Sequence, residues 1–558
     1  MQNGVSKKKN FTETVYRWIL VYGIPLFALA VVSLNASLIF DNVVWGDEAF
    51  SGNIIRGTDF AGIYQRVYYW ENHPPLYYFY LKIWTLILGD RTWVLHLASV
   101  VPFAGGIVLA MTYVRKHLGA IPAVSYALFT GLSATCAEYN QEIRMYELCF
   151  LFMLLAAYFA WRVCEDSAKG ALKKVIPLWG GLVLAGVAAA YTHYYGLVSS
   201  GLLLFVTGVV YFIRRKGKTW LFGVLSIAAY LVLYTPWLSV LFRQITYVKG
   251  SWWMDAPDGP KLLIDFVFGG GKLKYIFLAF VIAVTVFAVV AEVMDSRMKK
   301  ACTAAEGQEG QPVKGPAKGL STELRAMIIY WLTIALTVTF AYVASAVFKP
   351  ILVNRYMHPI IPLMLFAMMA AVKRIVRWGA EGKEKTPETS DEGKTTEKDV
   401  EKPEGKGILQ EEYLVVKNKR GRIVVIALIA AWCIMLVPAL LDFKYYRSVS
   451  RSEEMYTAQT LQVVGTPGEN TVFTSLGVQH LAWTVLQYYY PDSEVYNLDP
   501  SDLETDADEI WAFMGYEMNP ETIGIMTERG YKWECWPDAN VAKYPCLLYH
   551  FTKTETEN

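Results

Sequence analysis

Six short segments of the chain gather acidic, basic and aromatic residues of types that suit a site for a sugar and a phosphate. A carboxylate can accept a proton from a hydroxyl group, and an arginine can hold a phosphate by paired hydrogen bonds. Aromatic faces can stack on a sugar ring. The segments are Asp47-Glu48, Glu71-Asn72-His73-Pro74-Pro75, Gln141-Glu142-Ile143-Arg144-Met145-Tyr146, Tyr191-Thr192-His193-Tyr194-Tyr195, Trp252-Trp253-Met254-Asp255 and Asn354-Arg355-Tyr356.

Composition indicates which elements must position these residues. Of the 558 residues, 54% are hydrophobic and 18% are charged, against roughly a quarter charged in an ordinary soluble protein. The mean hydropathy is +0.28. These values exclude a single soluble globule, a disordered chain, collagen and a disulfide-rich secreted scaffold. The net charge of +2 argues against a dedicated nucleic-acid binder. We therefore expect a membrane protein.

Eleven apolar runs are long enough to cross about 30 Å of hydrocarbon as helices. They lie at 18–40, 92–113, 119–137, 146–163, 175–191, 197–213, 219–237, 275–293, 326–348, 357–372 and 423–441. One further run, 76–88, is short and contains Lys82, so its length alone does not decide whether it crosses.

Loop charges decide the orientation, because cytoplasmic loops are rich in lysine and arginine. The basic run 7–9 precedes the first span and places the N-terminus in the cytoplasm. If 76–88 does not cross the membrane, the densest basic clusters all lie on its cytoplasmic side. These are Arg115-Lys116, Arg214-Arg215-Lys216 and Lys299-Lys300. We therefore expect 76–88 to be a surface or re-entrant helix. The six polar segments then lie together on the outer side of a plasma membrane.

Each segment also has a plain structural interpretation. Asp47 and Glu48 suit the N-terminus of a helix, where acids are favoured, and His73 before two prolines suits a turn. Tyrosines and tryptophans at span ends are typical of the interfacial belt. Arg355 can reach the interface by snorkelling, and His193 can be a hydrogen-bonded interface residue. Their joint occurrence on one face favours a functional site.

The C-terminal region differs from the rest of the chain. Segment 379–422 is rich in Glu, Lys, Thr and Gly and is expected to be a disordered cytosolic linker between a transmembrane module, 1–378, and the last span, 423–441. Residues 442–558 regain a soluble composition, with β-like runs at 471–475, 494–497, 509–514, 531–536 and 547–551. We expect a small extracytoplasmic α/β domain. Its Cys535 and Cys546 either form one disulfide or remain free thiols.

Taken in order, these motifs resemble the polytopic glycosyltransferases of the GT-C class that use a lipid-phosphate sugar donor. They are most similar to the glycosyltransferase family 39-like group that contains the protein O-mannosyltransferases and the lipid A aminoarabinose transferase. The matching motifs are Asp47-Glu48, His73-Pro74-Pro75-Leu76, Gln141-Glu142-x-Arg144-Met145-Tyr146, Tyr191-Thr192-His193-Tyr194-Tyr195-Gly196 and Asn354-Arg355-Tyr356.

The resemblance implies an all-α polytopic bundle of about eleven transmembrane helices, with two surface helices in the first outer loop. It implies inverting transfer of a sugar from a polyprenyl-phosphate donor to an acceptor hydroxyl of a protein, glycan or lipid. Asp47 would be the general base, and Glu48 would shape the same pocket. The residues implied to bind the donor phosphate are His73, Arg144 and Arg355, and those implied to bind substrate are Gln141, Glu142, Tyr146 and Tyr356.

Metal dependence has two readings. Because cations can neutralise the charge that develops on a leaving phosphate, the arginines make a nucleotide or metal cofactor unnecessary. Some relatives nevertheless bind a divalent ion, and the nearest matches to their ligands here are Glu71 (or Asn72, which the register places there) and His193. A rival interpretation is a transporter or flippase of polyprenyl-linked sugars. A transporter should carry ionisable residues at mid-membrane and often internal repeats, and the sequence shows few such charges and no repeat.

Overall fold

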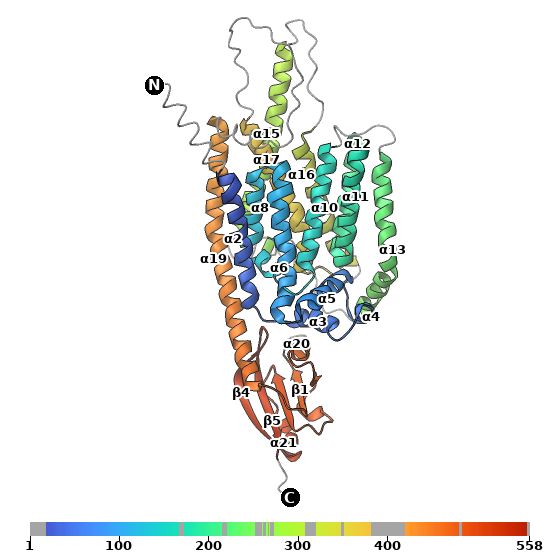
Figure 1. Cartoon of the computed structure of the whole chain (residues 1–558), viewed down its shortest axis with the longest axis vertical. Coiled ribbons are helices and arrows are strands. Elements are labelled where there is room, and N and C mark those ends of the chain that lie inside the picture. The colour runs from blue at the N-terminus through green and yellow to red at the C-terminus, as the bar shows by residue number, and fades with distance from the viewer. Residues whose placement is uncertain are drawn as a thin grey trace, which may run out of the picture. The chain divides into compact units, whose positions relative to one another are not determined.

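The computed structural model describes most of the chain (Figure 1). The described residues are 18–166, 172–214, 220–250, 259, 264–265, 267, 273–306, 320–347, 351–380, 419–478 and 482–554. Three predicted features therefore lie wholly or largely outside the description: the basic run 7–9, the aromatic segment 252–255 and the charged linker 379–422.

The chain forms two compact units, each assembled from separate stretches of sequence. Unit 1 comprises Met1–Ser33, Pro102–Ala137 and Leu148–Leu441, and unit 2 comprises Leu34–Val101, Glu138–Glu147 and Asp442–Asn558. Unit 2 thus joins the first long loop, a second short loop and the C-terminal region. The sequence alone did not indicate this grouping.

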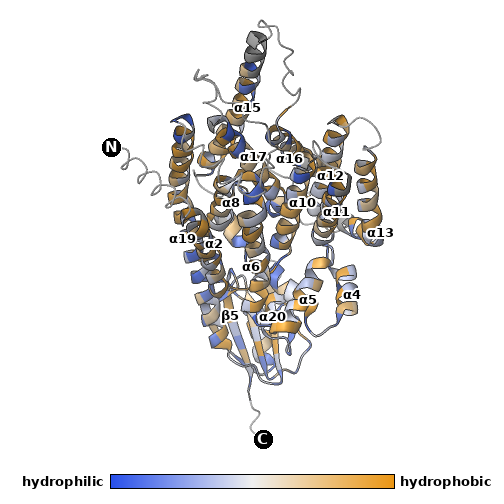
Figure 2. Cartoon of the chain, turned by 45° about the horizontal axis from the view of Figure 1, so that its top comes forward, coloured by the Kyte–Doolittle hydropathy of each residue, from blue (hydrophilic) through white to orange (hydrophobic). Residues whose placement is uncertain are grey.

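Long apolar helices form unit 1, and the chain is a multi-pass membrane protein. Ten helices in the described ranges are long and apolar enough to cross a membrane, and Figure 2 shows hydrophobic residues along most of their length. The helices wholly or partly in unit 1 include α2 (Ile24–Ala36), α6 (Thr92–Leu109), α10 (Tyr146–Asp166), α11 (Leu172–Thr192), α12 (Tyr194–Arg214), α13 (Leu221–Gly250), α15 (Leu273–Glu306), α16 (Thr322–Val347), α17 (Ile361–Ala380) and α19 (Lys419–Val464).

Ten of the eleven predicted spans correspond to these helices. The eleventh, 119–137, is divided into α8 (Ala120–Leu132) and the short α9 (Ala134–Tyr139). The cause is Ser133, whose backbone is extended, with φ −65° and ψ 129°. An extended residue cannot continue the ladder of helical hydrogen bonds. Alone, α8 is too short to count among the spanning helices.

Close packing of small and apolar residues holds unit 1 together. Helix α17 packs against α8, α15 and α16, and α12 packs against α11, α13 and α16. At the α12–α13 contact, a Cβ atom added to Gly223 would lie only 3.4 Å from the Cα atom of Gly208. Small residues at such crossings let two membrane helices approach closely.

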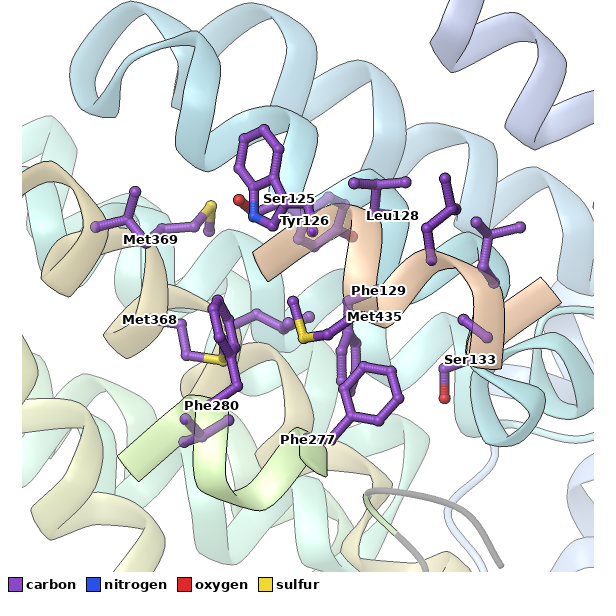
Figure 3. Close-up of a pocket in the computed structure, with 17 residues that line it drawn as sticks. Ser125, Tyr126, Leu128, Phe129, Ser133, Phe277, Phe280, Met368, Met369 and Met435 are labelled. Carbon is purple, nitrogen blue, oxygen red and sulfur yellow. The ribbon is translucent and has the colours of Figure 1, made fainter. Parts of the chain in front are cut away.

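An apolar pocket lies within unit 1 between α8, α15, α17 and α19. Figure 3 shows phenylalanine and methionine side chains around it, among them Phe129, Phe277, Phe280, Met368 and Met435. The pocket suits a hydrocarbon chain better than a polar ligand, because nearly all of its wall is apolar.

Three short helices, rather than the two expected, form the first loop in unit 2. They are α3 (Gly46–Ile55), α4 (Phe60–Trp70) and α5 (Leu76–Leu88). The unexpected helix, α4, starts at Asp59, whose side chain accepts a hydrogen bond from Gly62 N at 2.8 Å. Arg66 of α4 donates to the backbone carbonyls of Asn53, Ile54 and Arg56 at 2.8–2.9 Å. It thereby caps the C-terminus of α3 and fixes the angle between the two helices.

All five predicted strands are confirmed, and they form one sheet. They are β1 (Thr471–Leu476), β2 (Glu494–Tyr496), β3 (Glu509–Met514), β4 (Tyr531–Val541) and β5 (Tyr544–Lys553). The order is β2-β1-β3-β5-β4, with β1, β2 and β3 parallel and β5 antiparallel to both of its neighbours. Helices α20 (Ala482–Tyr489) and α21 (Pro520–Glu528) complete the domain.

Cys535 and Cys546 are free, so the expected alternative of a disulfide is not formed. Both lie on the β4–β5 hairpin, but Cys535 is opposite Tyr549 and Cys546 is opposite Ala539. Because the two cysteines are not cross-strand partners in this register, the sheet does not bring their sulfur atoms together.

Helix α19 connects the last span to the sheet without a break. It contains the predicted span 423–441 and continues to Val464. Within unit 2, Asp41 accepts hydrogen bonds from the Nε atoms of Arg447 and Arg451, at 2.8 and 2.9 Å. Asp41 therefore links the C-terminal half of α19 to the chain just before α3.

Candidate active site

The N-terminus of α3 places two neighbouring carboxylates in different environments. Glu48 is buried, and its Oε2 atom accepts a hydrogen bond from the backbone N–H of Trp45 at 3.2 Å. The helix-capping interpretation therefore holds for Glu48. Asp47 is half-buried, so its carboxylate is the one of the pair that a substrate can approach.

The loop Glu138–Glu147 is fastened against α3 through both backbone and side chains. The other oxygen of Glu48, Oε1, accepts a hydrogen bond from Ile143 N at 2.7 Å. Trp45 Nε1 donates to Glu142 Oε1 at 3.1 Å, and Gln141 Nε2 donates to Tyr446 OH at 3.3 Å. Glu48 thus links the start of α3 to the loop that carries the predicted arginine.

Arg144 is the buried cation of this site. Its Nη1 atom donates to the backbone carbonyl of Asp47 at 3.2 Å, to Ser51 Oγ at 3.1 Å and to Tyr78 OH at 3.5 Å. The same nitrogen lies 3.9 Å from Glu71 Oε2. Burial alone lowers the pKa of Arg144, but the surrounding oxygens outweigh this and raise it well above its usual range. The guanidinium therefore stays charged.

Glu71, His73 and Tyr78 form a buried chain of short hydrogen bonds between α4 and α5. Glu71 Oε1 lies 2.5 Å from His73 Nδ1, and Tyr78 OH donates to Glu71 Oε2 at 2.5 Å. Burial alone would raise the pKa of Glu71. The contacts with His73, Arg144 and Tyr78 outweigh that effect and lower its pKa to about 2. Glu71 is therefore ionised and holds both a histidine and an arginine.

Unit 2 accordingly assembles eight of the eleven predicted site residues. A network of hydrogen bonds and ion pairs connects seven of them through their side chains or backbones: Asp47, Glu48, Glu71, His73, Gln141, Glu142 and Arg144. Tyr146 is buried at the start of α10, with its ring 5.1 Å from that of Tyr139. Its burial favours a packing role as much as substrate contact.

The other three predicted residues lie in unit 1. His193 is buried, and its ring lies 5.2 Å from that of Tyr356. Arg355 is half-buried in the short helix η6 (Asn354–Ile360), with its guanidinium 5.9 Å from the ring of Tyr356. Within unit 1, the ring of Tyr356 thus lies near both His193 and Arg355.

Among the residues that the structure describes, no three or more His, Cys, Asp or Glu side chains are arranged to hold a metal ion. The two predicted ligands, Glu71 and His193, belong to different units. Both oxygens of Glu71 are already engaged by His73 and Tyr78. Metal binding by Glu71 and His193 stays a prediction.

Sequence reasoning missed four residues that shape the site: Trp45, Ser51, Tyr78 and Lys543. Trp45 and Ser51 flank Asp47-Glu48 on α3, and Tyr78 follows the His73-Pro74-Pro75 motif. Their helical spacing from the motif residues is a signal that could have found them. Lys543 is far away in sequence and carries no local signal.

These features define a class: a multi-pass membrane protein with a half-buried carboxylate beside a buried arginine on its loops. No family model matches the chain, and neither does any curated protein. Solved structures that share the fold include ArnT from Cupriavidus metallidurans, a lipid A aminoarabinose transferase of the GT-C class.

The apo ArnT structure has a TM-score of 0.54 and 14% sequence identity, covering 95% of this chain and 98% of ArnT. ArnT bound to undecaprenyl phosphate has a TM-score of 0.50 and 13% identity over the same shares of the two chains. The likeness shows that this chain has the ArnT fold, as its motifs predicted.

Proposed function

We propose that this protein is a membrane glycosyltransferase that moves a sugar from a polyprenyl-phosphate donor to an acceptor hydroxyl, with inversion at the anomeric carbon. The observation that carries the proposal is the pairing of the half-buried Asp47 with the buried Arg144 at the N-terminus of α3. The ArnT fold supports it, because one ArnT structure holds undecaprenyl phosphate. A donor of that chemistry suits the charge of Arg144 and the hydrogen-bonding ring nitrogens of His73.

In the proposed reaction, Asp47 takes the proton of the acceptor hydroxyl while the acceptor oxygen forms a bond to the anomeric carbon. The bond between that carbon and the phosphate oxygen breaks, and its electron pair leaves with the phosphate. Arg144 and His73 stabilise the negative charge that develops there. Glu48 holds the loop and α3 in register, so its role is to position the other groups.

The lipid tail of the donor needs an apolar environment, and the pocket between α8, α15, α17 and α19 offers one (Figure 3). Arg355, Tyr356 and His193 are the residues of unit 1 that we propose for donor and substrate contact. The sugar is not specified by this chemistry, because stacking aromatic rings do not distinguish one hexose from another.

The positions of the buried charges in the spans support a transporter less well than a transferase. Among the described spans, Arg374 pairs with Glu292 and Asp295. All three lie near the ends of the candidate spans Lys274–Met298 and Asn354–Gly379, whereas a transport pathway places ionisable groups near the bilayer midplane.

The test is label transfer by purified protein in detergent, with a panel of radiolabelled polyprenyl-phosphate sugars and crude envelope acceptors. Asp47→Asn should lower the rate by about 10²–10⁴-fold, the usual contribution of a general base. The matched control is Asp59→Asn, because Asp59 caps α4 and asparagine caps equally well. Thermal melting should show both variants folded.

Full activity in Asp47→Asn would refute Asp47 as the base. Absence of label release from every donor by folded wild-type protein would refute the transferase. In that case, movement of labelled lipid-linked sugar across liposomes, without any acceptor, would establish the transporter.

A further inference from the structure

The tip of the β4–β5 hairpin carries a lysine to the candidate active site. Val541 pairs with Tyr544, so only Ala542 and Lys543 form the turn. Lys543 Nζ lies 6.0 Å from the ring centroid of Trp45, within the range of a cation–π interaction. Trp45 is the residue that caps α3 just before Asp47 and donates to Glu142.

The hairpin tip contains a strained residue and is held in place by two hydrogen bonds. Ala542 has φ 58° and is the single non-glycine residue with positive φ in the described part of the chain. Glycine is the usual residue at a first turn position with positive φ. Thr457 Oγ1 donates to Ala542 O at 2.7 Å, and Asn540 N donates to Thr460 Oγ1 at 2.8 Å. Helix α19 thus anchors the turn from both sides.

Carboxylates from four separate segments act on the charge of the lysine. They come from α9, the N-terminus of α3, the outer part of α19 and the loop after α9, and they are Glu138, Glu48, Glu453 and Glu142. Burial alone lowers the pKa of Lys543, but these carboxylates outweigh that effect and raise it. Lys543 is therefore charged, and it is the cation that these four acids share.

We propose that Lys543 is a positioning residue of the active site, and that the C-terminal domain is part of that site rather than a separate module. Its charge compensates the acids around Trp45, and its side chain keeps Trp45 and Glu142 in contact. Without it, repulsion among the acids would disturb the start of α3 and the loop that carries Arg144. The assignment of a catalytic effect to Lys543 rests on the transferase function proposed above.

The experiment compares wild-type full-length protein with Lys543→Met and Lys543→Arg. The matched control is Lys532→Met, because Lys532 is an exposed lysine on β4 of the same hairpin. With Lys543→Met, the remaining acids ionise less readily. The acid limb of the pH profile of kcat/KM should therefore shift to higher pH by about one unit. At pH values below that limb, kcat/KM should be about tenfold lower than in the wild type. The loss should fall mainly on kcat, Lys543→Arg should restore most of it, and Lys532→Met should match wild type.

A second readout needs no substrate, so it separates this proposal from the transferase proposal. Thermal melting is measured between pH 4 and pH 8. The pairing of Lys543 with ionised carboxylates stabilises the fold above their ordinary pKa and is lost as the pH falls. The difference in melting temperature between wild type and Lys543→Met should therefore grow as the pH rises. Lys532→Met should show no such trend.

A Lys543→Met variant that melts and reacts like Lys532→Met would overturn the proposal. So would a loss that is equal at every pH and is not rescued by arginine, since that result would indicate packing alone. If wild-type protein transfers no sugar but the melting trend is present, the transferase proposal fails and the placement of Lys543 stands.

Discussion

Two buried arginines, Arg144 in unit 2 and Arg374 in unit 1, show how differently the same side chain can be used. Arg374 Nε donates to Glu292 Oε2 at 2.6 Å, its Nη2 atom pairs with Asp295, and it also donates to Ala291 O at 3.2 Å. Glu292 in turn accepts a hydrogen bond from Ser321 N at 2.8 Å. Two carboxylates thus neutralise one guanidinium, and the cluster joins α15 to α17.

The hydrogen bonds of Arg144 go to neutral groups, and the carboxylates that act on its charge are those of Asp47 and Glu71. Its hydrogen bonds go to a backbone carbonyl and two hydroxyls, and its one carboxylate neighbour in the salt bridges described, Glu71, lies 3.9 Å away. Glu71 is shared with His73. A guanidinium whose direct hydrogen bonds go to neutral groups keeps its attraction for a phosphate. Burial alone therefore does not single out Arg144 as a candidate for phosphate binding; the neutral partners of its direct hydrogen bonds do.

Replacing each arginine by methionine should affect stability and activity in opposite orders. Arg374→Met leaves Glu292 and Asp295 buried without a cation, which should lower the free energy of unfolding by about 3–5 kcal/mol. Arg144→Met removes hydrogen bonds to mostly neutral groups and should cost about 1–2 kcal/mol. Transfer activity should show the reverse order, with a loss of about 100-fold or more for Arg144→Met. Unfolding in denaturant measures the loss of stability, and label transfer measures the loss of activity.

The control for Arg374 is the triple variant Arg374→Met, Glu292→Gln and Asp295→Asn, which should recover most of the lost stability because no buried charge is left alone. Equal losses of stability in the two single arginine variants would contradict the contrast between them. So would an Arg374→Met protein that is stable but inactive.

The sequence predicted much of the fold because its signals are local. All five strands followed from short apolar runs between turn residues, and ten spans followed from hydrophobic length. Helix α4 was missed because its aromatic residues looked like a loop, although Asp59 marks its start. The break at Ser133 was missed because serine is common in membrane helices, and only the surrounding packing determines that this one is extended.

The candidate site was predictable where its residues lie in motifs. The contacts among Asp47, Glu71, His73 and Arg144 follow from loops expected on one face, although their chemical roles remain proposals. Lys543 could not be predicted, because a hairpin tip reaches the site only through long-range packing on α19. The grouping of 34–101 with 442–558 escaped prediction for the same reason.

Removing the acid beside Arg144 should change how the stability of the protein depends on pH. The pKa of Glu71 is lowered from 4.5 to about 2 in the folded protein. A lowered pKa stabilises the fold above the unfolded value, and this contribution, on the order of 3 kcal/mol, is lost as the pH falls from about 4.5 to about 2. Glu71→Gln should therefore flatten the pH dependence of thermal melting in that window.

Glu504→Gln is the control for this titration, because Glu504 is an exposed acid of the same unit. It should follow the wild-type curve. Parallel curves for wild type and Glu71→Gln between pH 4.5 and pH 2 would mean that Glu71 is not the group whose ionisation supports the network around Arg144.

The third prediction concerns packing rather than charge and should give the smallest effect. Helix α20 packs on α3 through Tyr488, and a Cβ atom added to Gly52 would lie 2.7 Å from Tyr488 Cε2. The ring cannot easily move, because Arg56 stacks on it at 4.8 Å and Thr92 Oγ1 lies 3.0 Å from its hydroxyl. Gly52→Ala should therefore cost about 1–3 kcal/mol of stability.

Gly524→Ala in α21 is the matched control. Nothing lies within 4 Å of its added Cβ atom, so alanine should raise stability slightly through its better helix propensity. Because Gly52 and Asp47 share α3, a displaced α20 should also lower transfer activity in Gly52→Ala. If stability falls while the rate per folded molecule stays at the wild-type level, Asp47 depends on the charged network around Arg144 and not on the α3–α20 contact.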